Sequence, residues 1–214
     1  MLEPIRHIIT RQRNVLASTS SRRREILQSV LFKFDVIKPE FEENLDKSSF
    51  SHPCEYVKEN AKQKAISVWK KLQRENEPGD LVIGCDTVVT MEGQIFEKPK
   101  DTEDAVSMLT RLSGKTHTVF TGVALITSCD KNGTNVDDYL VTTFHEATDV
   151  TMTEMNESVI QAYVNSGEPM DKAGSYGIQG AGATLIESIR GDYFNVVGLP
   201  LHRFAKELYY MYME

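Results

Sequence analysis

A short apolar run at residues 15–17 stops at four consecutive hydroxyl residues (18–21), and three arginines (22–24) and a helical pattern follow directly. This order predicts a strand, a tight loop and a helix with three cations in its first turn. Cations at a helix N-terminus oppose the helix dipole unless an anion compensates them. Main-chain N–H groups, hydroxyls and guanidinium groups gathered there predict a phosphate site. The alternative is a plain helix start with Ser20 or Ser21 as the N-cap.

Segments with strand patterns and segments with helical patterns alternate along most of the chain. The strand patterns occur at residues 34–37, 81–89, 116–127, 139–151 and 184–189. The helical patterns occur at residues 53–75, 101–113, 156–166 and 201–212. This alternation predicts an α/β protein, and the hairpin signal at Asn132-Gly133 predicts a mixed, twisted sheet. We expect a single domain over residues 1–214, in which the hairpin at about residues 115–155 forms a second lobe beside a cleft.

The composition is that of a soluble globular protein and excludes several classes of function. Hydrophobic residues make up 40% of the 214 positions, and no apolar run approaches the roughly 20 residues of a membrane span. The net charge of −7 argues against a general nucleic-acid binder but allows a locally basic pocket for a small anion. Cys54, Cys85 and Cys129 show no metal-ligand spacing. We therefore expect reduced cysteines in a cytoplasmic protein without a secretory signal.

A carboxylate within an apolar strand is the second candidate for chemistry. Asp86 lies in the phrase GCDT (84–87), and a carboxylate is costly to bury unless something pairs with it. Asp86 either bonds a neighbouring loop or serves as a metal ligand or general base, and Gly84 allows a close approach of backbone or ligand. Glu43, next to Glu42 in an irregular polar segment, is solvated surface unless Asp86 needs a second carboxylate to hold a divalent cation such as Mg²⁺.

Three further polar residues have a functional and an ordinary interpretation each. Lys64 lies in a helical phrase at 59–65 and Lys98 precedes a proline, and each lysine is more often solvated than a ligand. Gln179 lies in a glycine-rich segment at 174–180. Its amide could hydrogen-bond to the edge of a base, since loops on a rigid sheet commonly carry function, or the segment could be a simple turn.

Signatures of several other enzyme folds are absent from the sequence. It contains no Walker A phrase, no G-x-G-x-x-G after a strand, no G-x-S-x-G and no H-E-x-x-H. Kinase-like, Rossmann, α/β-hydrolase and zincin folds are therefore unsupported.

Taken together, five separated phrases resemble the Maf family of nucleoside triphosphate pyrophosphatases. They occur in the family's order between about residues 13 and 210: LASTSSRR (16–23), AKQKA (61–65), GCDT (84–87), EKP (97–99), and GSYGIQG (174–180) with GDYFNVVGLP (191–200). One such phrase is weak evidence, whereas five in order are specific. The chain is similar in particular to the Maf-like domain of animal acetylserotonin O-methyltransferase-like proteins, where that domain is fused to a methyltransferase.

The resemblance implies a two-lobed fold similar to that of inosine triphosphate pyrophosphatases. It also implies metal-dependent cleavage between the α- and β-phosphates of dTTP, UTP or modified pyrimidine nucleotides, or of 7-methyl-GTP in a sister group. Asp86 matches the catalytic acid–base or metal-binding carboxylate. Arg22, Thr87 and Gln179 match positions tied to substrate choice in the dTTP/UTP branch, which the phrases favour. The remaining matches surround the phosphates and the metal: Ser18, Arg23, Glu43, Lys64 and Lys98.

Three positions depart from the family pattern without removing a catalytic group. Ser21 replaces a usual proline but is itself a capable N-cap. Cys85 replaces a usual alanine, which is a small change at a buried site. Glu97 stands where glycine is frequent, and this puts the affinity for metal or phosphate in doubt.

We predict hydrolysis of dTTP or UTP to the monophosphate and pyrophosphate, with Asp86 and Glu43 holding Mg²⁺ or Mn²⁺. A homodimer is expected from the resemblance alone. One rival is a non-catalytic nucleotide-binding regulatory protein, which needs the arginines but not the two carboxylates. The other is an RNA-binding module, which the acidic charge and the lack of a basic and aromatic stripe oppose.

Overall fold

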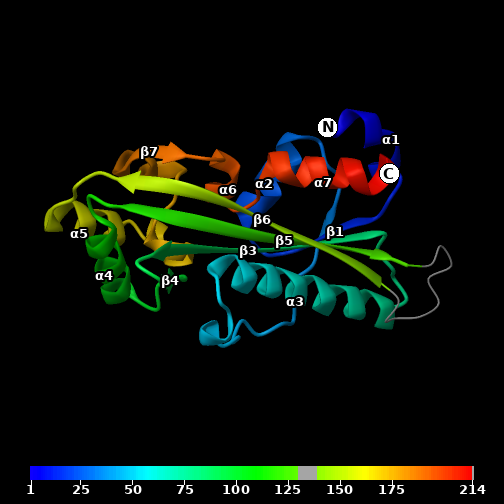
Figure 1. Cartoon of the computed structure of the whole chain (residues 1–214), viewed down its shortest axis with the longest axis horizontal. Coiled ribbons are helices and arrows are strands. Elements are labelled where there is room, and N and C mark those ends of the chain that lie inside the picture. Colours follow the sequence, from blue (N-terminus) through cyan, green and yellow to red (C-terminus); the bar gives the residue numbers. More distant parts are fainter. Residues whose placement is uncertain (130–138, 214) are drawn as a thin grey trace. The chain divides into compact units, whose positions relative to one another are not determined.

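The protein is a mixed α/β structure built on one twisted sheet (Figure 1). The computed structural model describes residues 1–129 and 139–213. Its strands are β1 (Asn14–Ala17), β2 (Asp35–Val36), β3 (Leu81–Met91), β4 (Gln94–Phe96), β5 (Thr116–Ser128), β6 (Tyr139–Met152) and β7 (Ile186–Arg190). In these residues the sheet order is β2-β1-β3-β5-β6-β7, and β4 pairs with β3 outside this order.

The helices alternate with the strands along much of the chain. The α-helices are α1 (Arg6–Ile9), α2 (Ser21–Ser29), α3 (Pro53–Arg74), α4 (Thr102–Leu112), α5 (Glu157–Asn165), α6 (Tyr193–Val197) and α7 (Leu201–Met213). The 3-10 helices are η1 (Glu3–Ile5), η2 (Lys47–Ser49), η3 (Glu168–Asp171), η4 (Ala173–Ser175) and η5 (Gly180–Leu185). No helix in the described ranges is long and apolar enough to cross a membrane.

The order of the sheet reverses at β1. This strand pairs in parallel with β2 on one side and with β3 on the other, and Ala17 lies opposite Gly84. Because α2 leads from β1 to β2 and α3 leads from β2 to β3, the two helices cover opposite faces of the sheet (Figure 1). In open α/β sheets, ligands bind beyond the carboxyl ends of the strands at such a reversal. The hydroxyl-rich loop after Ala17 begins at this edge.

The predicted mixed α/β class is confirmed by the strand directions. β1 pairs in parallel with both of its neighbours, whereas β4 pairs antiparallel with β3, and β7 pairs antiparallel with β6.

The chain divides into two compact units. Unit 1 comprises Met1–Asp86, Gly122–His145 and Gly198–Glu214, and unit 2 comprises Thr87–Thr121 and Glu146–Val197. The single domain over 1–214, its lobe at about 115–155 and the cleft remain predictions. The turn predicted at Asn132-Gly133 lies outside the described residues.

In unit 1, helix α3 packs main chain against main chain on the sheet. A Cβ atom built on Gly84 would lie 2.1 Å from the carbonyl oxygen of Ala61. A Cβ atom built on Gly122 would lie 2.5 Å from the carbonyl oxygen of Val57. Glycine is thus required at both positions by the close approach of the helix. The core beneath this helix includes Trp69, which is 1% exposed.

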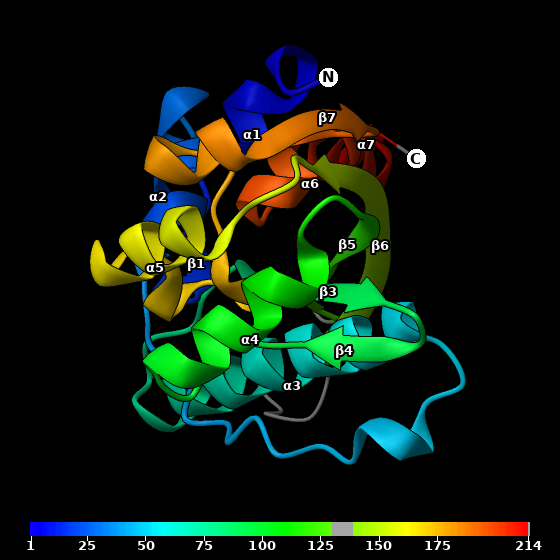
Figure 2. The ribbon, with the colours of Figure 1, turned by 90° about the vertical axis from the view of Figure 1, so that its left-hand side faces the viewer.

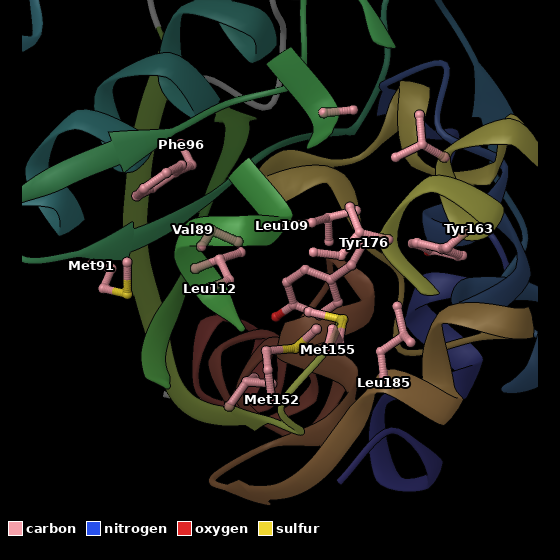
Figure 3. Close-up of a cluster of buried hydrophobic side chains, with 14 of the residues drawn as sticks. Val89, Met91, Phe96, Leu109, Leu112, Met152, Met155, Tyr163, Tyr176 and Leu185 are labelled. Atoms are coloured by element: carbon pink, nitrogen blue, oxygen red, sulfur yellow. The ribbon is translucent and has the colours of Figure 1, made fainter. Parts of the chain in front are cut away.

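Unit 2 has its own apolar core, part of which Figure 3 shows. Residues of β3, β4, α4, β5, β6 and α5 contribute to it, and three methionines (Met91, Met152 and Met155) fill gaps among the branched and aromatic side chains. α4 and α5 lie side by side in both ribbon views (Figures 1 and 2). The tyrosines Tyr163 and Tyr176 bury their rings in this core.

Most predicted elements are confirmed to within two residues. The strand predicted at 184–189 begins two residues later, at Ile186, because residues 184 and 185 still belong to η5. Glu168 accepts hydrogen bonds from the N–H groups of Ala181 and Gly182, and Thr184 Oγ1 donates to the oxygen of Ala181, so a turn persists to residue 185. The sequence patterns do not predict the short elements η1, α1, η2, β4, η3, η4, η5 and α6.

Candidate functional site

The predicted phosphate loop leaves the carboxyl end of β1 and enters α2. Ser20 is the N-cap, and its Oγ accepts from the N–H of Arg23 at 3.5 Å. Ser18, which is 5% exposed, accepts from Nη1 of Arg23 at 3.1 Å, and Nε of Arg23 donates to the oxygen of Gly198 at 2.8 Å. These contacts hold the side chain of Arg23 in place. Arg22 is half-buried at the same helix start.

Arg24 differs from its two neighbours. Its side chain is exposed, and in the described part of the chain the structure gives it no hydrogen bond or ion pair.

Asp86 forms the centre of a buried polar cluster in unit 1. It lies two residues after Gly84, hence beside the loop that leaves β1, and it is 6% exposed. Nζ of Lys64 donates to its Oδ1 at 2.7 Å, and Nδ2 of Asn60 donates to its Oδ2 at 3.2 Å. Both donors lie on α3, one helical turn apart. The close packing of α3 against Gly84 therefore places both side chains beside Asp86. A buried carboxylate is thus paired, as the sequence analysis required.

Glu43 joins this cluster from the irregular segment before α3. Its Oε2 lies 2.6 Å from Nζ of Lys64, so the carboxylates of Glu43 and Asp86 converge on one ammonium group. The side chain of Glu43 is 48% exposed, whereas that of Asp86 is 9% exposed. One carboxylate therefore faces solvent and the other is enclosed.

The electrostatics of the cluster favour a basic carboxylate. Burial raises the pKa of Asp86 above its ordinary value, the charge and hydrogen bond of Lys64 oppose this rise, and the negative charge of Glu43 adds to it. Burial also raises the pKa of the adjacent Cys85 thiol to about 11, which keeps the thiol protonated and inert at neutral pH.

The donor set fits a hard divalent cation that is completed by substrate and water. Two carboxylates converge, and the buried Oδ1 of Asn60 has no hydrogen-bond partner. Mg²⁺ is commonly bound by one or two carboxylates together with phosphate oxygens and water. Within the described ranges no group of three or more His, Cys, Asp or Glu side chains could hold a metal ion.

The other predicted site residues lie in unit 2. Oγ1 of Thr87 lies 3.0 Å from Oγ1 of Thr121, which in turn donates to the oxygen of Asn195. Lys98 is exposed and Gln179 is half-buried. The structure gives neither of these two side chains a hydrogen bond or ion pair to another described residue. Their grouping with the phosphate residues of unit 1 stays a prediction.

Comparison with known proteins identifies the family. The sequence matches the family described as Maf-like protein over residues 13–211. The chain belongs to the Maf family. It is 48% identical over 213 residues to a human protein named probable bifunctional dTTP/UTP pyrophosphatase/methyltransferase. That match covers 99% of this chain and 34% of the human protein, so the chain spans about a third of that relative.

Bacterial Maf relatives match over nearly their whole length. The dTTP/UTP pyrophosphatase of Clostridium perfringens strain 13 is 47% identical over 195 residues, which cover 91% of this chain and 94% of that protein. The structure of a HAM1 protein from Coxiella burnetii matches with a TM-score of 0.51 at 15% identity, covering 92% of this chain and 98% of that one. This last likeness shows that the chain shares the fold of that HAM1 protein.

Three polar residues with structural links to the predicted Maf site were not found from the sequence. Asn60 is one helical turn from Lys64, and its position between buried apolar residues on α3 was the available signal. Glu168 and Tyr163 bond the segment that carries Gln179. No periodicity could indicate that contact, because it joins a helix to an irregular loop.

Proposed function

We propose that this Maf protein is a nucleoside triphosphate pyrophosphatase that hydrolyses dTTP and UTP to the monophosphate and pyrophosphate. The observation that carries the proposal is the convergence of the carboxylates of Asp86 and Glu43 on the ammonium group of Lys64. This cluster lies beside the arginine-bearing loop, where the order of the sheet reverses. The names of the human and clostridial relatives support the substrate class. Modified pyrimidine nucleotides are proposed as further substrates.

The start of α2 binds the polyphosphate in this proposal. The main-chain N–H groups at its N-terminus and the guanidinium groups of Arg22 and Arg23 supply hydrogen bonds and positive charge. Ser18 holds Arg23 in position through the 3.1 Å hydrogen bond. The cost of placing these cations at the positive end of the helix dipole is offset when the phosphates bind.

Asp86 accepts the proton of the attacking water in this proposal. The water oxygen forms a bond to the α-phosphorus, the bond from that phosphorus to the bridging oxygen breaks, and pyrophosphate leaves. Burial makes Asp86 a stronger base than an exposed aspartate, which suits this role. Lys64 stabilises the negative charge that develops on the phosphate oxygens, and Asn60 keeps the carboxylate in its orientation.

Asp86 and Glu43 would hold the Mg²⁺ or Mn²⁺ ion that we propose as cofactor. Such an ion, when bound, neutralises charge on the phosphates and lowers the pKa of a bound water. The chain would supply the two carboxylates, and the substrate and water would supply the remaining oxygens.

Release of pyrophosphate from UTP and dTTP tests the proposed reaction. We expect turnover with Mg²⁺ or Mn²⁺ and none with a chelator, and Asp86→Asn should lower kcat at least 10³-fold, as about the size of a lost catalytic base and charge. Thermal unfolding of the same variant shows whether the fold is kept. Wild-type rates in Asp86→Asn would refute the assignment, whereas tight UTP binding without turnover in the wild type would favour the regulatory alternative.

The three consecutive arginines provide a matched set for the phosphate contacts. Arg22→Gln and Arg23→Gln should each raise KM for UTP about tenfold or more, because each removes a charged hydrogen bond to phosphate. Arg24→Gln removes the same charge from the same helix turn but from an exposed side chain. Arg24→Gln should leave KM for UTP within about twofold of the wild-type value. Equal increases of KM in all three variants would show that only the net charge of the helix start affects binding of UTP.

A homodimer and a cytoplasmic location are also proposed. The dimer rests on the family resemblance, and sedimentation equilibrium of the purified chain tests it. The location rests on the described cysteines, which form no disulfide, and imaging of the tagged protein tests it.

A further inference from the structure

The segment that carries Gln179 is tied to two side chains of α5 and η3. Oε2 of Glu168 accepts from the N–H of Ala181 at 3.0 Å, and Oε1 accepts from the N–H of Gly182 at 2.9 Å. The hydroxyl of Tyr163 donates to Oε1 of Glu168 at 3.0 Å and accepts from the N–H of Gly177 at 3.2 Å. Main-chain groups on both sides of Gln179 are thus fixed by one connected pair.

Close packing reinforces these hydrogen bonds. A Cβ atom on Gly182 would lie 2.4 Å from the hydroxyl of Tyr163, and one on Gly180 would lie 3.0 Å from Oε2 of Glu168. Gly180 also has a φ of +68°, which other residues adopt only at a cost. The segment therefore follows Glu168 and Tyr163 at contact distance, with no side chain between them.

The pair is held in the protonation states that these bonds need. Burial raises the pKa of Glu168, but the hydrogen bonds from Gly182, Tyr163 and Ala181 outweigh burial and leave its pKa below the ordinary value. Burial raises the pKa of Tyr163, whose ring lies in the unit 2 core shown in Figure 3. A carboxylate and a neutral phenol are the acceptor and donor that the observed contacts require.

The amide of Gln179 is left available by this arrangement. It is half-buried and makes no hydrogen bond to another described residue, although its main chain is fixed two residues before it and two residues after it. A fixed main chain with an uncommitted amide is a preorganised recognition element, because ordering the segment costs little when a ligand binds.

We propose that Glu168 and Tyr163 are positioning residues that set the preference among pyrimidine nucleotides by aligning the amide of Gln179 with the base. This inference rests on the proposed function. Neither residue needs to touch the substrate, so loss of the pair should weaken discrimination between bases rather than the chemical step.

A double-mutant cycle on substrate preference tests the inference. The kcat/KM values for UTP and CTP are measured for the wild type, Glu168→Gln, Gln179→Ala and the double variant, with Tyr163→Phe as a second change in the pair. We expect Glu168→Gln and Gln179→Ala each to lower the UTP-to-CTP ratio about tenfold, the size of one lost hydrogen bond, through KM for UTP. The double variant should lower it no further than Gln179→Ala does.

Ser113→Ala is the matched control within unit 2. Ser113 also links a side chain to main chain, since its Oγ accepts from the N–H of Met155 at 2.7 Å, but among the described residues its side-chain hydrogen bonds go to Met155 and not to the Gln179 segment. It should lower thermal stability without changing the UTP-to-CTP ratio. Equal losses for both nucleotides in Glu168→Gln, or multiplicative losses in the double variant, would overturn the inference.

The same variants separate this inference from the proposed function. If the wild type releases no pyrophosphate, the proposed reaction fails, and the cycle is then measured from the dissociation constants of UTP and CTP. A cycle that shows coupling in binding would keep Glu168 and Tyr163 as positioning residues. Absence of binding, or of any preference between UTP and CTP in the wild type, would overturn the inference.

Discussion

Replacing Lys64 with methionine removes the positive charge at the centre of the candidate site. Methionine keeps much of the volume of the lysine stem, so the change removes a charge without opening a large cavity. In the native chain the ammonium lies 2.7 Å from Asp86 and 2.6 Å from Glu43, so those carboxylate oxygens are within about 5.3 Å of each other. At an effective dielectric constant of about 20, two negative charges at that distance repel by about 3 kcal/mol.

The buried partner determines the size of the effect. Removing one side of a buried ion pair leaves an uncompensated charge and costs about 3–5 kcal/mol. We therefore expect Lys64→Met to lose about 3–5 kcal/mol of unfolding free energy at pH 7 in urea denaturation. Without Lys64 the raised pKa of Asp86 rises further, so the folded variant binds a proton that the unfolded chain releases. The loss of stability should accordingly grow as the pH rises from 5 to 8.

A second lysine on the same helix provides the control. Nζ of Lys71 lies 3.0 Å from Oε1 of Glu40 on the exposed surface, where ion pairs contribute little. Lys71→Met should therefore unfold at nearly the wild-type urea concentration. The double variant Lys64→Met/Asp86→Asn should regain most of the lost stability, because it no longer buries an unpaired charge. If Lys64→Met is as stable as Lys71→Met, or the double variant regains nothing, the charge argument is wrong.

Three further changes test other parts of the structure. Burial lowers the pKa of His117 to about 4, so between about pH 6.5 and 4 the unfolded chain binds a proton that the folded chain does not. The free energy of unfolding should therefore fall by about 3 kcal/mol as the pH is lowered through that range. Urea denaturation of His117→Gln at several pH values should show that this decrease is lost. Gly84→Ala should lower both unfolding free energy, by about 1–3 kcal/mol or more, and pyrophosphate release, because its Cβ would lie 2.1 Å from a main-chain oxygen of α3. As a comparison, Gly79→Ala should lower both quantities less than Gly84→Ala does, because its Cβ would lie 3.3 Å from a side-chain carbon of Val15 rather than against main chain. Ser20→Ala should cost about 0.5–1 kcal/mol in thermal unfolding, since its capping bond is long, and no measurable loss would mean that the cap contributes nothing.

The long elements were predictable because their patterns are strong. The apolar spacing over residues 53–75 has a single interpretation, and α3 follows it from Pro53 to Arg74. The short elements were not predictable for a physical reason. α1 has four residues and α6 has five, so neither repeats the 3.6-residue period, and helices this short are not stable without tertiary packing.

The candidate site was predictable in its residue types but not in its connections. A carboxylate in a buried strand implied a partner, but the sequence did not indicate that Lys64 and Asn60 on α3 supply it. The bond between Glu168 and the main chain of Gly182 joins residues 14 positions apart through an irregular loop. Such contacts depend on tertiary structure, which no local pattern contains.

The two glycines under α3 have a consequence for how this protein tolerates change. Gly84 faces Ala61 and Gly122 faces Val57, so the two contacts are one helical turn apart along the axis. Two such glycine contacts fix both the rotation of the helix about its axis and its position along that axis. One contact alone would leave the helix free to rotate. A saturation scan scored by nucleotide turnover should therefore find these two positions as intolerant as Asp86, although neither glycine has a side chain that could take part in the reaction.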